Sequence, residues 1–358
     1  MIRFTSTGDE WSTNWNDEFF IDTIEEHKNS DCKILVLEWQ HWVPKLKSLR
    51  QNMIIRLVKK YDICFFLIRE MAVPFGNDSS EMKKLLDELN NLNVFFITLS
   101  EDWKFHIDES KTFNIPWFVP NSIYFYISEN TTIDFDYRPK DFTFNMLLGS
   151  DRHYRTLFFE LVGNEPYVYS TYFGHKKFRP KSSRHLEDDD ILNNLSNQDI
   201  FSEKLQTMEH VKRADDHFCI SHIIPEKIYN NSHFDIVTES QALFNTLNFT
   251  TEKTGKPLST GRFFIWYDSP HKVEYLRQFG FELQDYLCYY DSIEDNVSRL
   301  ASVMELIKDI GDNENYIKRI YEETKDARMH NQEVFKKLSR TYQSNISSWI
   351  NGQINKAS

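Results

Sequence analysis

Four charged side chains between residues 234 and 281 have types and spacing that could do chemistry. Glu239 ends the apolar run FDIVTE, and Glu252, Lys253 and Lys256 follow in FTTEKTGKP. A carboxylate at a strand end can accept two hydrogen bonds from ribose hydroxyls. A lysine at a helix start adds a point charge where backbone N–H groups already favour phosphate. The set suits a nucleoside diphosphate, whereas a lone Glu–Lys pair is more typical of a helix cap with a solvated lysine.

The elements that must position these side chains alternate between strands and helices. The predicted order is a strand over FDIVTE, a helix in FTTEKTGKPLSTG, a strand over RFFIWYD and a helix over SPHKVEYLRQFG. Thr250 or Thr251 lies near the cap of the first helix, and Gly261 suits the position after its end. Pro257 lies inside this helix, so we expect it to be short or to begin nearer the proline.

The run IVTE, FTTEKTGKP and GRFFI resembles the nucleotide-sugar-binding motif of fucosyltransferase-like glycosyltransferases with two Rossmann-like domains, the GT-B architecture. It is also similar to a related group of glycosyltransferase-like proteins common in viruses and marine bacteria. In that family the matching Glu and Lys lie at the nucleotide, which implies this role for Glu252 and Lys253, with Glu239 and Lys256 as neighbours. The sequence departs from the family pattern at Gly255 and at YDSPH, which replaces a Gly-rich turn.

A fainter match covers FNMLLGSDRHYR, which resembles the strand-then-arginine segment that opens the second domain of the same family. The resemblance implies that Arg152 and Arg155 face the diphosphate. The residues add their own argument, because arginines in the first turn of a helix oppose its dipole unless an anion compensates. His153, between them, is more typical of a structural histidine.

The N-terminal half alternates short apolar runs with helical patterns. A short strand is predicted at 2–6 and buried strands at 33–38, 62–69 and 93–100, with helices between them. This order favours right-handed β-α-β crossovers and an open parallel sheet with helices on both faces. The predicted fold class is therefore α/β, with two Rossmann-like domains facing a cleft as in GT-B proteins.

A chain of 358 residues is longer than one hydrophobic core usually serves. We predict an acceptor-side Rossmann-like domain at 1–138 and a nucleotide-sugar-binding Rossmann-like domain at 139–310. The C-terminal helices at 311–358 are expected to pack back on the first domain.

Transfer of a sugar with inversion requires a base that deprotonates the acceptor hydroxyl. Such a base should come from the first domain, where Glu38, Glu70 and the pair Glu101–Asp102 all lie at strand ends. The sequence does not separate these candidates, and each alone is more typical of a cap or a surface charge. A retaining transfer would need none of them as a base.

Other cofactor and metal patterns are not found in the sequence. The twelve histidines lack H-x-x-x-H and H-E-x-x-H spacing, and no Walker A, G-x-G-x-x-G or G-x-S-x-G motif occurs. The acidic run EDDD at 187–190 is more typical of a solvated face than of a metal site. We therefore expect no cofactor beyond a UDP- or GDP-linked sugar as co-substrate, and no metal.

A basic and aromatic segment at 167–185 could contact the acceptor or DNA. It carries Lys176, Lys177 and Arg179 among tyrosines and phenylalanines, a combination that suits phosphates and stacked bases. GT-B enzymes of viruses glucosylate hydroxymethylated cytosine in DNA, which requires base flipping. The net charge of −12 and the simpler interpretation as a solvated loop both weigh against this. A non-catalytic nucleotide-binding or interaction protein on the same scaffold is the other alternative.

The compartment follows from what the sequence lacks. No apolar run reaches the length of a membrane span, and the N-terminus has no signal-peptide pattern. Four scattered cysteines are typical of buried free thiols. We expect a cytoplasmic protein, in the host cytoplasm if it is viral. The oligomeric state stays open.

Overall fold

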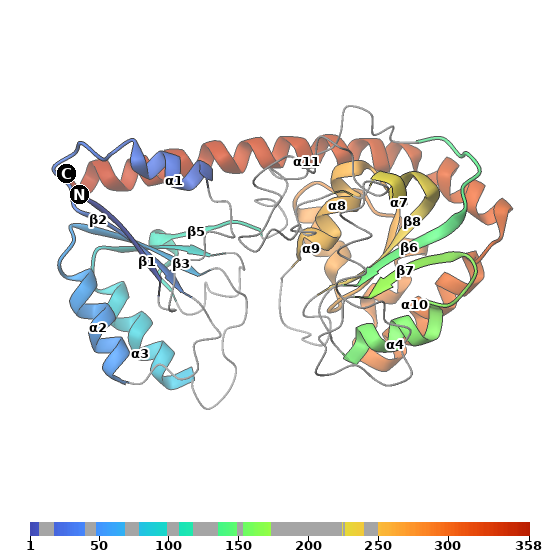
Figure 1. The fold of residues 1–358 in the computed structure, drawn as a ribbon, viewed down its shortest axis with the longest axis horizontal. Helices are drawn as coiled ribbons and strands as arrows, with labels where there is room; N and C mark the ends of the chain where they lie inside the picture. The colour runs from blue at the N-terminus through green and yellow to red at the C-terminus, as the bar shows by residue number, and fades with distance from the viewer. Residues whose placement is uncertain are drawn as a thin grey trace. The chain divides into compact units, whose positions relative to one another are not determined.

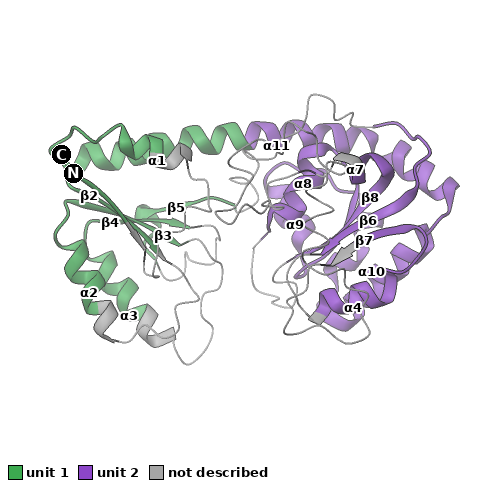
Figure 2. Cartoon of the chain, in the orientation of Figure 1, with its two compact units in different colours: residues 1–120, 339–358 green, residues 121–338 purple. Residues whose placement is uncertain are grey.

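The computed structural model describes residues 1–6, 18–39, 48–68, 79–98, 107–116, 135–148, 153–172, 224, 226–239 and 250–358. The chain divides into two compact units, one of residues 1–120 with 339–358 and one of residues 121–338 (Figure 2). This division gives residues 121–138 to the second unit, whereas the sequence assigned them to the first domain.

The first unit contains a parallel five-stranded sheet in the order β1-β2-β3-β4-β5 (Figure 1). Its strands are β1 (Ile2–Ser6), β2 (Ile34–Trp39), β3 (Ile63–Ile68), β4 (Val94–Thr98) and β5 (Thr112–Asn114). The first four confirm the predicted strands. The sequence did not predict β5, because three residues are too few to show a periodicity.

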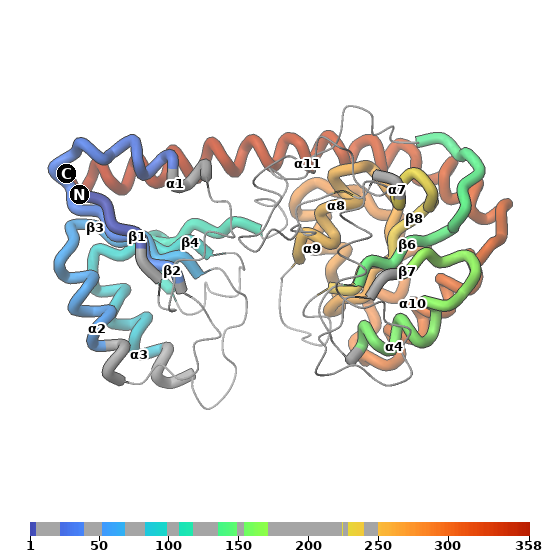
Figure 3. Tube along the Cα trace, viewed as in Figure 1, coloured from blue at the N-terminus to red at the C-terminus, as the bar shows by residue number. Residues whose placement is uncertain are grey.

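Helices cover both faces of this sheet. On one face, α2 (Ser48–Val58) and α3 (Ser79–Asn90) pack in a core that includes Phe66 and Leu89. On the other, α1 (Glu18–Glu25) lies beside the end of α11 (Glu314–Ala357), as Figures 1 and 3 show. Strands covered on both faces must be apolar throughout, which explains the run ICFFLI in β3.

The second unit contains a parallel four-stranded sheet in the order β7-β6-β8-β9. The strands are β6 (Phe142–Leu148), β7 (Val168–Tyr172), β8 (Ser232–Thr238) and β9 (Phe264–Tyr267). The chain goes from β6 outward to β7, and then returns to the opposite side of β6 for β8. The carboxyl ends of β6 and β8 therefore flank a topological switch point, where open α/β sheets bind ligands.

Helices also cover both faces of the second sheet. Tyr267 of β9 faces α4 (His153–Val162) and α10 (Asn296–Ile310), with the ring of Phe158 centred 5.4 Å away. Helix α8 (Glu252–Thr260) lies on the opposite side of the sheet from α4 and α10 (Figure 1). At the amino end of β8, Phe234 packs against Tyr321 of α11, with ring centroids 5.5 Å apart. The helices and 3₁₀ turns described in this unit are α4 (His153–Val162), α7 (Glu226–Asn231), α8 (Glu252–Thr260), α9 (Lys272–Gln278), η6 (Asp285–Leu287), η7 (Tyr289–Ser292), α10 (Asn296–Ile310) and most of α11. The 3₁₀ turn η2 (Glu109–Lys111) belongs to the first unit.

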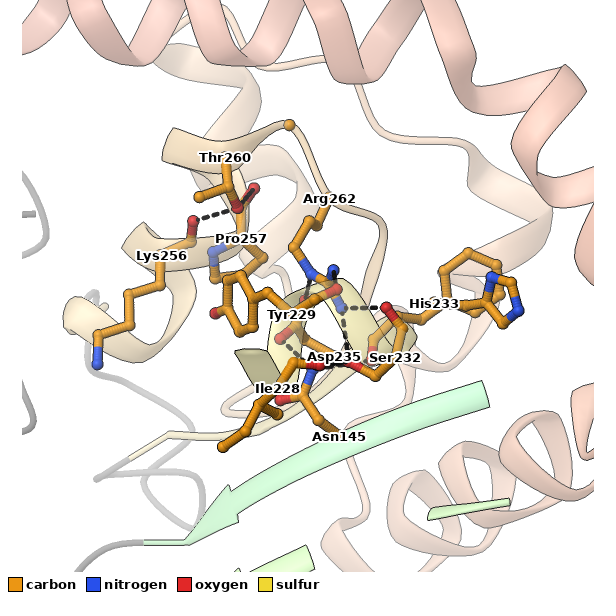
Figure 4. A network of polar contacts seen from close by, with 12 residues as sticks. Asn145, Ile228, Tyr229, Ser232, His233, Asp235, Lys256, Pro257, Thr260 and Arg262 are labelled. Atoms are coloured by element: carbon orange, nitrogen blue, oxygen red, sulfur yellow. Dashed lines mark hydrogen bonds and ion pairs between the residues drawn. The ribbon is translucent and has the colours of Figure 1, made fainter. Parts of the chain in front are cut away.

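The amino ends of β6, β8 and β9 are joined by a polar network (Figure 4). Arg262 forms an ion pair with Asp235 at 2.5 Å and donates to the carbonyl oxygen of Tyr229 at 2.7 Å. Asn145 donates to the other carboxylate oxygen of Asp235 at 2.8 Å and to Ser232 Oγ at 2.9 Å. A buried charge is tolerated only with such partners, so this end of the sheet is fixed by internal bonds.

Helix α11 is 44 residues long and supplies both units, since residues 339–358 belong to the first and 314–338 to the second. In the first unit Ile346, Ile350 and Ile354 lie on one helical face in the core beneath the sheet. Thr23 and Ser347 hydroxyls lie 2.8 Å apart and tie α11 to α1. Within the ranges described, no helix combines the length and apolar character needed to cross a membrane.

Replacing Ile350, which is fully buried, with alanine tests the contribution of α11 to the first unit. The cavity should lower the free energy of unfolding by about 2–5 kcal/mol, measured in urea. Asn345→Ala, at an exposed position of the same turns, is the control and should change stability by less than about 0.5 kcal/mol. Equal effects of the two substitutions would show that this end of α11 does not pack on the sheet.

Candidate functional site

Glu239 follows directly after β8 and is completely buried. Its carboxylate accepts hydrogen bonds from the Thr251 amide at 3.0 Å, the Thr251 hydroxyl at 2.6 Å and the Thr254 hydroxyl at 2.6 Å. These bonds compensate the desolvation of the carboxylate and join the end of β8 to the start of α8. Glu239 thus positions the helix that carries the other predicted residues.

Helix α8 begins at Glu252, with Thr251 as its N-cap in an extended conformation. Pro257 lies inside this nine-residue helix, so the helix is short but does not begin near the proline. It ends at Gly261, whose left-handed φ of 63° confirms the predicted position.

Glu252 and Lys253 form an ion pair at the start of α8. Lys253 Nζ lies 2.7 Å from Glu252 Oε1, and the two side chains keep 22% and 14% of their surface exposed, respectively. Burial by itself would raise the pKa of Glu252, but Lys253 and then Lys256 outweigh it and hold this pKa at about 2. The carboxylate is therefore an acceptor throughout the physiological pH range, and part of the Glu252 side chain stays exposed.

Lys256 lies one turn further along α8 and is mostly buried. Its side chain extends away from the network at the amino ends of the strands (Figure 4). Lys256 follows Glu252 by four residues, so the two lie on the same side of the helix, and its charge helps to lower the pKa of Glu252. The sequence grouped Glu239, Glu252, Lys253 and Lys256, and the structure brings all four together at the start of α8.

Arg155 of α4 lies at the same edge of the second sheet. Its guanidinium is buried and donates from Nη2 to the carbonyl oxygen of Thr238 at 3.1 Å, while the hydroxyl of Tyr154 donates to the carbonyl oxygen of Glu239. The first turn of α4 therefore holds the end of β8. Contact of Arg155 with a diphosphate stays a prediction.

A second group of buried charges, which the sequence analysis missed, follows β9. Asp268 Oδ2 lies 3.7 Å from Lys272 Nζ, and both side chains are only 2% exposed. Asp291 of η7 accepts the Lys272 and Val273 amides at 3.0 and 2.9 Å, which caps α9. The one signal in the sequence was YDSPH, which carries Asp268 where the resemblance led us to expect a Gly-rich turn.

The remaining predicted residues belong to the first unit or fall outside the description. Glu38 lies in β2 opposite Ser6 of β1 and Leu67 of β3, and its side chain is buried. The positions that the structure does not describe are Glu70, Glu101, Asp102, Arg152, Lys176, Lys177 and Arg179. Their roles stay predictions.

The edge formed by β8, β9 and the helices that follow them has the chemistry of an anion and polyol site. It offers an ionised carboxylate for hydroxyl groups and lysines for phosphate, next to the switch point of the sheet. Among the residues described, no group of three or more His, Cys, Asp or Glu side chains could hold a metal ion. The expected metal independence stays a prediction.

No family model matches the chain, and a search of curated proteins finds no significant match. Among solved structures, the chain is similar to an alpha-glucosyltransferase in complex with UDP and a 13-mer DNA containing a HMU base. The two are 10% identical with a TM-score of 0.41, over 92% of this chain and 84% of the other. An alpha-glucosyltransferase (AGT) in complex with UDP gives a TM-score of 0.37 at 10% identity, over 90% and 84%. At these values the likeness assigns no residue or substrate to this chain.

Replacing Glu239 with alanine tests its positioning role. Three donors of Thr251 and Thr254 would lose their acceptor, and leaving buried donors unsatisfied costs about 1–3 kcal/mol each. We expect a loss of about 3 kcal/mol or more in the free energy of unfolding, measured in urea. Glu274→Ala, an exposed glutamate of α9, is the control and should have little effect. A Glu239 variant as stable as this control would contradict the role.

Proposed function

We propose that this protein is a glycosyltransferase that uses a nucleotide sugar, linked to UDP or GDP, as its co-substrate and needs no other cofactor. The observation that carries the proposal is the ionised, partly exposed Glu252 paired with Lys253 at the start of α8. This pair lies beside the switch point of a parallel sheet, where nucleotides bind in proteins of this architecture.

Each residue of the site has a distinct role in the proposed donor complex. Glu252 accepts hydrogen bonds from the ribose hydroxyls, while Lys253 and Lys256 attract the diphosphate. Glu239 holds the start of α8 in place through Thr251 and Thr254. We extend the diphosphate contact to Arg155 in the first turn of α4 and to Arg152, which precedes that helix in the sequence.

In the proposed reaction an acceptor hydroxyl attacks the anomeric carbon of the donor sugar. The bond from that carbon to the phosphate oxygen breaks, and the nucleoside diphosphate leaves with the electron pair. Lysines and arginines stabilise the charge that develops on the leaving group. If the transfer inverts the configuration, the hydroxyl proton goes to a base from the first unit, for which Glu38, Glu70 and Asp102 remain the candidates.

Titration calorimetry with UDP-glucose and GDP-fucose, in the presence of EDTA, tests the donor site. Wild-type protein should bind one of the two, and Glu252→Ala should weaken that affinity by about tenfold to a hundredfold, since hydrogen bonds to charged groups contribute about 1.5–3 kcal/mol. Glu274→Ala should bind as the wild type does. Unchanged affinity in Glu252→Ala would overturn the assignment of the site.

Transfer assays across a panel of acceptors separate an enzyme from a binding protein. Donor binding that depends on Glu252, without transfer to any glycan or modified DNA and without donor hydrolysis, would favour the non-catalytic alternative.

A second candidate function is glucosylation of hydroxymethylated bases in DNA. The observation that favours it is the basic and aromatic segment at 167–185, which offers cations for phosphates and rings for bases. A gel shift with hydroxymethylated duplex tests this proposal at low and moderate salt. Lys176→Glu combined with Arg179→Glu should weaken binding at least about tenfold, whereas exposed Lys336→Glu on α11 should not. If both variants bind the duplex equally well, the segment at 167–185 does not recognise DNA as the acceptor.

A further inference from the structure

Asp268 is a buried carboxyl group that the proposed donor contacts do not use. It directly follows β9, the neighbour of β8 in the sheet, so its backbone lies next to that of Glu239. The Ser269 amide donates to Asp268 Oδ1 at 2.7 Å, and Arg299 Nε donates to the Asp268 carbonyl oxygen at 2.9 Å. These bonds fix both the backbone and the side chain of Asp268.

Charged groups surround Asp268 from every element packed against it. They are Glu239 at the end of β8, Lys272 of α9, Asp291 of η7 and Arg299 of α10. Arg155 of α4 lies close by, at the carbonyl oxygen of Thr238. The carboxyl group of Asp268 therefore lies among charges of both signs, without the solvent that would screen them.

Asp268 is linked to the proposed donor site through Glu239, first by charge and then by hydrogen bonds. The charge of Glu239 acts on Asp268, and the Glu239 carboxylate is bonded to Thr251 and Thr254 in the first turn of α8. Glu252 and Lys253 lie in that same turn. A negative charge placed at the start of α8 is thus separated from Asp268 by one buried carboxylate and its hydrogen bonds.

We propose that Asp268 is a positioning residue of the donor site and that its carboxyl group takes up a proton when the anionic nucleotide sugar binds. The inference rests on the proposed function, because it names the anion that binds at the start of α8. With Asp268 neutral, the end of β9 presents less negative charge to Glu239 and to the incoming diphosphate.

The electrostatics of the cluster support this coupling. Burial is the main reason why the pKa of Asp268 is raised to about 7, Lys272 opposes the shift, and Glu239 and Asp291 add to it. The group is therefore about half protonated near neutral pH. A bound diphosphate adds negative charge and raises this pKa further, so binding is accompanied by proton uptake. Affinity must then fall as the pH rises through the pKa of the free protein.

Calorimetry of UDP-glucose or GDP-fucose binding, whichever the wild type binds, tests the inference. The diphosphate of these donors is a diester with no titration of its own between about pH 6 and pH 8. In buffers of different ionisation enthalpy near pH 7, the wild type should take up a fraction of a proton per donor bound. Its affinity should fall by about threefold to tenfold from pH 6 to pH 8, since one unit of pKa coupling corresponds to tenfold.

Two substitutions of Asp268 separate coupling from structure. Asp268→Asn should abolish both the proton uptake and the pH dependence, whereas Asp268→Glu, which keeps a carboxyl group, should restore them. Asp285→Asn is the control, because Asp285 pairs with Arg277 at the surface and should leave both unchanged. Uptake that persists in Asp268→Asn would overturn the inference.

The wild-type measurement also decides the inference if Asp268→Asn does not fold, since binding without proton uptake would overturn it by itself. Binding that depends on Glu252 but releases or takes up no proton would leave the proposed function standing. Failure of the wild type to bind any nucleotide sugar would overturn the proposed function and the inference together.

Discussion

The buried carboxylate of Glu239 is the constraint on which the candidate site depends. An ionised group without solvent costs several kcal/mol unless it is paired or hydrogen-bonded, and Thr251 and Thr254 supply the donors. Because these donors lie in the first turn of α8, satisfying Glu239 also fixes where Glu252 and Lys253 lie. Tyr154 adds a bond to the Glu239 carbonyl oxygen, so α4 is tied to the same point.

The two ends of the second sheet use buried charge differently. At the amino ends, Arg262, Asp235 and Asn145 satisfy one another with short bonds, and the result is a fixed junction between strands. At the carboxyl ends, Glu252 and Lys253 are paired but keep part of their surface exposed, and Asp268 carries a pKa near neutrality. Charge that is only partly compensated by the protein is what a charged ligand can engage. The partly exposed charges thus lie at the carboxyl ends of the strands, which is also where the switch point lies.

The long helix α11 contributes residues to both units, although each unit has its own sheet. Its first part packs on the second sheet through Tyr321, and its last turns complete the core of the first through Ile350. The first unit is therefore built from both ends of the chain, and its core is complete only when the last residues are present. This explains why α11 has an apolar stripe but remains polar overall.

The sequence by itself determined the class of fold and which charged residues are candidates for the site. Apolar runs such as ICFFLI could only be buried strands, and FTTEKTGKP placed Glu252 and Lys253 at a helix start, because both signals are local. Only the tertiary structure decided the strand order that creates the switch point. It also decided the partners of Glu239, and it brought Asp291 to the start of α9 across a separation of 19 residues. These features depend on contacts between distant segments, and no local pattern of residue types specifies which buried charges will meet.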